Sequence, residues 1–233
     1  MSSESAASPS PSRRLVRGLL ETLAIIVVAV LISTALRAWV MRSFYIPSGS
    51  MEQTLQVDDR VLVNQLAPRF DPPDRGDIIV FDDPADWLSD DQVSSYRPNP
   101  VLEFLGLAPS DAGQQLIKRV IGRGGDTVEC CDAQGRLLVN GEPITETYLE
   151  AGMAPSQMEF SVTVPDGHYW VMGDNRSNSA DSRFHQDTEP FVPAENVVGT
   201  VFLINWPLSH FTWMSSPEEV FAQVPEPEGI TGS

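Results

Sequence analysis

The chain has 233 residues, of which 42% are hydrophobic, and it carries a formal net charge of −17 with a pI of about 4.4. Its length suffices for one folded domain with a core and one further segment. The strong acidity excludes a nucleic-acid-binding protein, because such proteins need a basic surface.

The N-terminal part of the chain contains a long apolar run. Residues 1–17 are rich in Ser, Ala and Pro and are expected to be disordered. The run from 18 to 36 is interrupted only by Glu21, and its length is about the 20 residues that a bilayer-spanning helix needs. A cleaved signal peptide is the alternative, but the run is long for one and no Ala-x-Ala-like site follows it. We therefore expect a retained transmembrane helix over residues 18–41.

Arginines flank this run unequally, with three before it and two after it. Because positive charge is retained on the cytoplasmic side, we expect a single-pass protein with a cytoplasmic N-terminus and an extracytoplasmic domain. The five residues are Arg13, Arg14, Arg17, Arg37 and Arg42.

The rest of the chain is predicted to be mostly β, because short runs rich in Val and Ile alternate with turn signals and no helical period persists. Residues 42–206 form the expected β-rich domain, with a surface insertion over 82–113 that includes a short helix near 101–105. A C-terminal segment with an acidic tail follows over 207–233. Strands are expected over 60–64, 77–81, 116–121, 127–131, 136–139, 160–164, 169–172 and 198–205.

The two cysteines, Cys130 and Cys131, are adjacent and exclude a disulfide framework. They form either a vicinal disulfide or two thiols. No Cys/His spacing indicates a metal site, and we expect no cofactor.

Residues 42–55 suit the presentation of a nucleophile. Pro47 favours an extended approach, and Gly49 permits a sharp turn between Ser48 and Ser50. Such a turn presents one hydroxyl with a backbone N–H nearby that can receive negative charge. A Ser/Gly linker next to the membrane is the alternative interpretation of this stretch alone.

Fourteen of the 15 basic residues are arginine, and the single lysine is Lys118. Arginine cannot act as a base, whereas lysine can if burial lowers its pKa. Leu116, Ile117, Val120 and Ile121 around Lys118 are apolar, as a buried strand position requires, and Arg119 lies directly beside it. Unless the lone lysine arose by chance, Ser50 and Lys118 are the leading nucleophile–base pair.

Residues 173–183 form a loop dense in hydrogen-bonding side chains. Asp174 with Arg176, and Asp181 with Arg183, are opposite charges two residues apart, so we expect each pair to form on an extended chain and stiffen the loop. The three histidines have no triad context and are interpreted as structural or surface residues; they are His168, His185 and His210.

Four short motifs, in order behind an apolar anchor, resemble those of the bacterial type I signal peptidases (leader peptidases), which are membrane-anchored Ser/Lys endopeptidases. The resemblance spans most of residues 20–206. The motifs are Ile46-Pro-Ser-Gly-Ser-Met51 with Thr54-Leu55, Arg75-Gly-Asp-Ile-Ile-Val-Phe81, Lys118-Arg-Val-Ile-Gly122 with Gly125-Asp126, and residues 173–183.

The resemblance implies a β-rich catalytic domain, with a smaller β-excursion over about residues 127–164. It implies Ser50 as the nucleophile and Lys118 as the general base. The Ser48 hydroxyl and the Ser50 N–H would form the oxyanion hole, and Ser179 would orient the amine of Lys118. The charged residues of the loop, Asp174, Arg176, Asp181 and Arg183, would support the site.

By the same resemblance, the substrates are signal peptides of exported preproteins, cut after small residues at the outer surface of the bacterial plasma membrane. The lipid bilayer and the secretion translocon are the other expected partners. Shallow apolar pockets would be lined by Ile46, Leu55 and Ile117. The chain departs from the family pattern at Gln53, where proline is common, and at Ser177, where aspartate is common.

Two other functions are alternatives for this chain. A self-cleaving repressor-type Ser/Lys protease would need a DNA-binding N-terminal domain, and here an apolar segment occupies that place. A membrane-anchored β-domain that only binds partners explains the topology but not the lone lysine or the ordered motifs.

Overall fold

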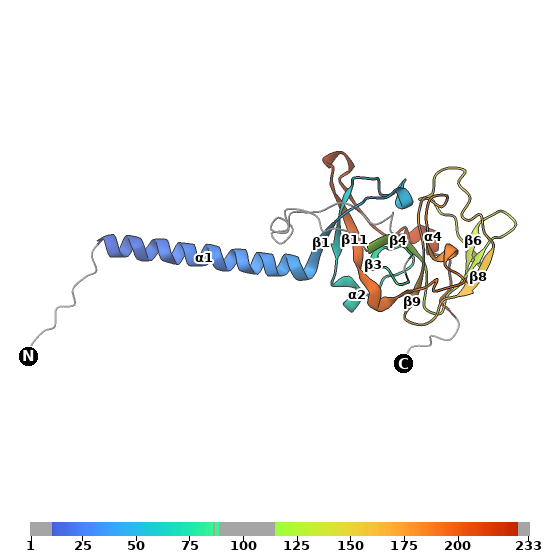
Figure 1. The fold of residues 1–233 in the computed structure, drawn as a ribbon, viewed down its shortest axis with the longest axis horizontal. Coiled ribbons are helices and arrows are strands. Elements are labelled where there is room, and N and C mark those ends of the chain that lie inside the picture. Colours follow the sequence, from blue (N-terminus) through green and yellow to red (C-terminus); the bar gives the residue numbers. More distant parts are fainter. Residues whose placement is uncertain (1–10, 86, 89–114, 228–233) are drawn as a thin grey trace, which may run out of the picture.

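The computed structural model describes residues 11–85, 87–88 and 115–227, and within its first helix the side chains of residues 17–33 and 40. That helix, α1 (Pro11–Val40), projects from a β-rich body (Figure 1). Within the described residues, no helix combines the length and the hydropathy needed to cross a membrane. The transmembrane helix expected over 18–41 therefore stays a prediction.

The body confirms the mostly β class, and within the described residues every strand pairing is antiparallel. In that part of the chain, eight strands form the larger sheet. Its order is β1 (Met41–Tyr45), β2 (Arg60–Asn64), β11 (Val197–Trp206), β3 (Ile78–Asp82), β4 (Gln115–Arg123), β9 (His168–Met172) and β10 (Val192–Pro193), with β12 (Thr212–Trp213) paired to β11.

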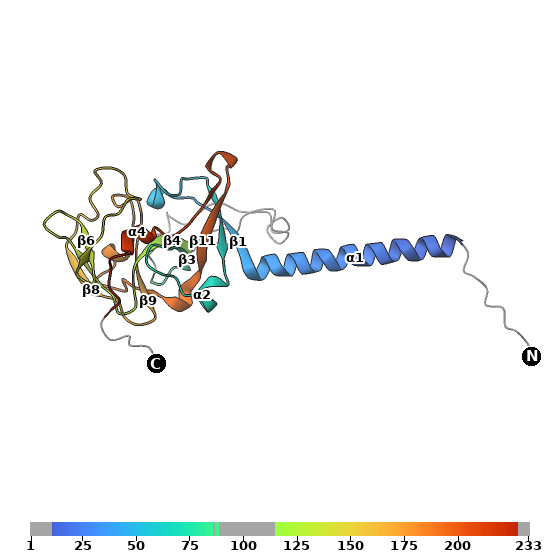
Figure 2. The same cartoon turned by 180° about the vertical axis from the view of Figure 1, so that it is seen from behind.

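A smaller sheet lies at the end of the body away from α1, as both views show (Figure 1 and Figure 2). It occupies the range in which the β-excursion is expected. Asn140 and Gly141, with φ of 53° and 79°, form the turn before its edge strand, as Asn-Gly turns do. The strands of the smaller sheet lie in the order β7 (Glu142–Pro143), β6 (Leu137–Val139), β5 (Thr127–Cys130) and β8 (Phe160–Thr163).

Short helical turns connect these strands. The α-helical ones are α2 (Ala67–Phe70) and α4 (Glu218–Phe221), and the 3-10 turns are η1 (Gly49–Met51), η2 (Ser182–Phe184), η3 (Ala194–Asn196) and η4 (Leu208–His210). Most of the expected insertion over 82–113, including its helix near 101–105, lies outside the described residues.

The C-terminal segment contributes to the core. Val220 and Phe221 of α4 are buried in the cluster that joins the smaller sheet to Trp170 of β9. Glu226 forms an ion pair with Arg123 at the end of β4. The folded body therefore continues past residue 206. The structure also joins Cys130 to Cys131 by a disulfide, the first of the two states considered for them.

Candidate active site

The turn that carries Ser50 is anchored from both sides. Ile46 is buried, its N–H donates to the carbonyl of Asp59 at 2.9 Å, and Met51 is buried on the other side of the turn. Ser48 is extended, with φ −124° and ψ 154°, and η1 begins directly after it. The extended approach and sharp turn expected from the sequence thus hold Ser50 at the mouth of a cavity.

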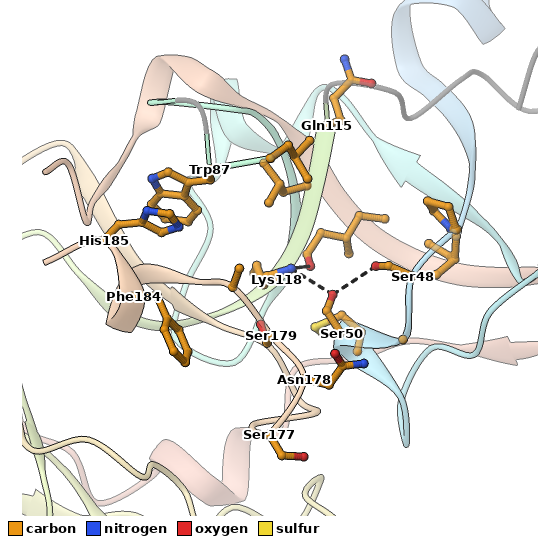
Figure 3. Close-up of a pocket in the computed structure, with 18 residues that line it drawn as sticks. Ser48, Ser50, Trp87, Gln115, Lys118, Ser177, Asn178, Ser179, Phe184 and His185 are labelled. Carbon is orange, nitrogen blue, oxygen red and sulfur yellow. Dashed lines mark hydrogen bonds between the residues drawn. The ribbon is translucent and has the colours of Figure 1, made fainter. Parts of the chain in front are cut away.

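Strand β4 brings Lys118 to this turn. β4 pairs with β3 so that Lys118 lies opposite Ile79, in a part of the sheet formed by buried residues. The Nζ atom of Lys118 lies 2.9 Å from Ser50 Oγ and donates to the carbonyl of Ile117 at 3.1 Å (Figure 3). Only 4% of Lys118 is exposed. The serine and the lysine are therefore in direct hydrogen-bond contact.

Burial lowers the pKa of Lys118 to about 8, although the charges of Asp181 and Asp174 act in the opposite direction. Within the described residues, no carboxylate forms a salt bridge with this amine. About a tenth of the amine is then neutral at pH 7, against less than about one part in a thousand for an ordinary lysine. A neutral amine in this position can accept the Ser50 proton.

The loop over 173–183 holds the nucleophile turn. The N–H of Asn175 donates to the Ser50 carbonyl at 3.0 Å, and its Nδ2 donates to the Gly49 carbonyl at 3.1 Å. Gly173 packs so closely that an added Cβ would lie 2.5 Å from the Ser50 carbonyl oxygen and 2.2 Å from Ser179 Oγ. Only glycine fits there, because a side chain would push the two segments apart.

One of the two expected ion pairs in this loop forms. Arg183 and Asp181 make two hydrogen bonds of 2.8 Å, and Asp181 also accepts from the Gly173 N–H at 2.9 Å. Burial opposes the ionisation of Asp181, but the hydrogen bond and charge of Arg183 hold the pKa of that carboxyl below its ordinary value. This pair stiffens the loop as expected.

The expected pairing of Asp174 with Arg176 is wrong. The chain bends and turns at these residues instead of running extended, so residues two apart do not share a face. Asp174 accepts from Arg119 at 2.8 and 2.6 Å, and Arg176 forms a buried ion pair with Glu146. These pairs tie the loop to β4 and to the segment that follows β7.

Two further serines were expected to act beside the pair. Ser48 Oγ lies 3.4 Å from Ser50 Oγ. Ser179 is buried on the cavity wall, where its hydroxyl helps to lower the pKa of Asp181, and within the described residues it forms no hydrogen bond with the Lys118 amine.

The cavity beside Ser50 and Lys118 has a volume of about 560 Å³. Ile46 and Ile117 line it, and their expected role in substrate binding stays a prediction. Leu55 does not: it is fully buried in the core cluster with Met51, so its expected place in a substrate pocket is wrong. The turn at Gln53 folds the chain back and directs Leu55 inward, where apolar burial is favourable.

The family model described as signal peptidase, peptidase S26, matches residues 19–206. The chain belongs to this family. A signal peptidase I of Mycobacterium tuberculosis is 40% identical over 230 residues, covering 87% of this chain and 77% of the relative. One of Leptolyngbya laminosa is 35% identical over 199 residues, covering 85% of each. A crystal structure of a signal peptidase I from Enterococcus faecalis is 30% identical, covers 55% of this chain and 95% of its own, and has a TM-score of 0.36.

Membership in the peptidase S26 family makes the protein a serine endopeptidase and confirms the resemblance drawn from the four motifs. The two departures from the family pattern have local explanations. Gln53 takes a φ of 87°, which a proline ring cannot adopt. Ser177 donates its hydroxyl to Asn175 Oδ1 at 3.0 Å and so supports the loop without a charge. Within the described residues, no cluster of three or more metal-ligating side chains is present.

Sequence reasoning missed one wall of this signal peptidase cavity. Trp87, Phe184 and His185 line it, although His185 was interpreted as a structural or surface residue. Phe184 and His185 directly follow the loop motif, which is a signal that could have placed them near the site. Trp87 stands about a hundred residues away in the sequence with no motif around it, so no sequence signal indicated it.

Proposed function

We propose that this peptidase removes signal peptides from exported preproteins by means of a catalytic dyad formed by Ser50 and Lys118. The observation that carries the proposal is the 2.9 Å contact between the Ser50 hydroxyl and a buried lysine amine whose pKa is about 8. A charged lysine cannot accept a proton, and a distant one cannot reach the hydroxyl.

In the proposed reaction, Ser50 Oγ attacks the carbonyl carbon of the scissile bond while its proton moves to Lys118 Nζ. The negative oxygen of the tetrahedral intermediate receives hydrogen bonds from the Ser50 N–H and the Ser48 hydroxyl. Lys118 then protonates the leaving amine, which leaves an acyl-enzyme on Ser50. Water activated by Lys118 hydrolyses this ester and restores the serine.

The remaining site residues support this chemistry. Ser179 is the proposed partner that orients the Lys118 amine, because its buried hydroxyl lies on the same cavity wall. The ion pair between Asp181 and Arg183 stiffens the loop over residues 173–183. Ile46 and Ile117 provide apolar walls near Ser50, which suit the small residues before the cleaved bond.

We further propose that α1 anchors the protein in the plasma membrane and that the body contacts the outer lipid surface. All large apolar side chains of α1 between residues 19 and 32 are exposed, and water would not solvate such a surface favourably. The body carries further exposed apolar side chains on α2 and on the segment from η4 to β12. They include Phe70, Leu208, Phe211 and Trp213.

The dyad is tested with the full-length protein in detergent micelles and a synthetic peptide that spans a signal-peptide junction. We expect a single cut after a small residue, detected by mass spectrometry. Ser50→Ala should abolish the cut, whereas Ser161→Ala, which changes an exposed serine on β8, should not. An active Ser50→Ala protein would refute the dyad.

The topology is tested by adding a protease to intact cells. The body should be digested or reduced to a protected core without lysis. Access to the body only after lysis would reverse the proposed orientation.

A further inference from the structure

The cavity continues past Lys118 to an aromatic wall built by Trp87, Phe184 and His185. The indole of Trp87 and the imidazole of His185 stack with ring centroids 4.5 Å apart and 4° between their planes. Phe184 lies near them and is 58% exposed (Figure 3). The proposed cleavage chemistry uses none of these three side chains.

Hydrogen bonds hold this wall in place. The Asp83 carboxylate accepts from the backbone N–H of Trp87 at 2.8 Å and of Leu88 at 2.9 Å. The indole Nε1 of Trp87 donates to the carbonyl of Glu189 at 3.1 Å. A surface that is already ordered binds a side chain without the cost of fixing its own rotamers.

The wall is apolar in character at neutral pH. Burial lowers the pKa of His185, although the charges of Asp181 and Asp83 act in the opposite direction. The Asp181 carboxylate is itself bound to Arg183, and that of Asp83 to backbone amides. The imidazole is therefore neutral, and its stack with Trp87 suits an apolar or aromatic side chain.

Lys118 fixes which part of a substrate reaches this wall. After attack by Ser50, the leaving amine takes its proton from Lys118 and so departs beside Nζ. In Figure 3, the Lys118 amine lies between Ser50 and the Trp87–His185 stack, whereas Ser48 lies on the other side of Ser50. The chain that follows the cleaved bond therefore runs past Lys118 toward the aromatic wall.

We propose that Trp87, Phe184 and His185 form a subsite for a large apolar or aromatic side chain among the first few residues after the cleaved bond. The subsite rests on the proposed cleavage of signal peptides and adds a determinant of specificity on the mature side of the substrate. It makes the start of the exported protein, and not only the signal peptide, part of what the enzyme recognises.

The test uses the full-length enzyme and peptides that are identical up to the cleaved bond. After the bond they carry alanine at every position, or a single phenylalanine at the first, second or third position. For the wild type, kcat/KM for the best phenylalanine peptide should exceed that for the alanine peptide by about tenfold, which is typical of one apolar pocket.

Phe184→Ala and Trp87→Leu should each reduce this ratio to about twofold or less, since they remove part of the wall. Phe184 is largely exposed, so its substitution leaves the core intact even if Trp87→Leu lowers the melting temperature. The matched control is Phe211→Ala, because Phe211 is also exposed but does not line the cavity. It should keep the wild-type ratio.

Equal cleavage of all peptides by the wild type would overturn the subsite, and so would a ratio that survives both substitutions. Cleavage of no peptide at all would instead refute the proposed function, and the subsite with it. The subsite is supported if the preference for the phenylalanine peptide is lost in Phe184→Ala or Trp87→Leu and is kept in Phe211→Ala.

Discussion

Lys118 and Arg119 are neighbours on β4 and point to opposite faces of the sheet. They are almost equally buried, with 4% and 3% of each residue exposed. Arg119 has a complete set of partners: two hydrogen bonds to Asp174, one of 2.7 Å to the carbonyl of Gly76, and the ring of Tyr148 at 4.0 Å. Among the residues that the structure describes, Lys118 contacts a hydroxyl and a carbonyl but no carboxylate.

The difference in partners gives the two cations opposite roles. Burial disfavours both charges, but the hydrogen bonds and charge of Asp174 outweigh it and raise the pKa of Arg119. For Lys118, burial prevails and lowers the pKa to about 8. One face of β4 thus keeps a permanent charge that holds the loop, and the other keeps an amine that can lose its proton.

The largest effect on turnover is expected when Lys118 is replaced by arginine, in contrast to the replacement of Arg119 by lysine. Lys118→Arg keeps the charge but fixes the protonated state, so turnover should fall by at least about 10⁴-fold, as it should in Lys118→Met. Arg119→Lys should retain measurable turnover and lower the melting temperature. Turnover is measured by peptide cleavage and stability by a thermal melt of each variant. Substantial activity in a folded Lys118→Arg protein would refute Lys118 as the general base.

The second effect concerns the partner of Arg119. Asp174→Asn leaves a buried guanidinium without its carboxylate, and loss of one member of a buried pair costs about 3–5 kcal/mol. The free energy of unfolding, measured with urea, should fall by that amount. Asp74→Asn is the control, because Asp74 pairs with Arg123 at an exposed position and its loss should cost less than about 1 kcal/mol. Equal effects would show that burial of the pair is unimportant.

A smaller loss is expected on the catalytic face when an oxyanion donor is removed. Ser48→Ala should lower kcat by about 10²–10³-fold with little change in stability, because Ser48 is exposed and its hydroxyl is proposed to act only on the intermediate. Unchanged kcat in this variant would remove Ser48 from the mechanism.

The smallest effect is the dependence of the wild-type rate on pH. The neutral amine is the active form, so kcat/KM should be constant above a pH of about 8 and fall about tenfold for each unit below it. Arg119 keeps its charge throughout this range, so the midpoint should report Lys118 alone. A profile that is flat from pH 6 to 9 would contradict a titrating lysine base.

Local patterns in the sequence determined a large part of this protein. A short run rich in valine placed β2 at the same residues that the structure assigns, and the Asn140-Gly141 pair placed a turn because these residues tolerate positive φ. The chemistry of Ser50 and Lys118 could also be predicted, since lysine, unlike arginine, can serve as a base, the chain has a single lysine, and its three histidines have no triad context.

Only the tertiary structure decided which side chains meet. Asp174 pairs with Arg119, 55 residues away, instead of Arg176, because the loop turns at that point and β4 lies beside β9. Leu55 faces the core and Trp87 faces the cavity because turns of the chain and the order of the strands, and not the local sequence, set their surroundings. Periodicity and turn propensity act over a few residues, whereas the order of the strands in the sheet brings distant segments together, and no local pattern encodes that order.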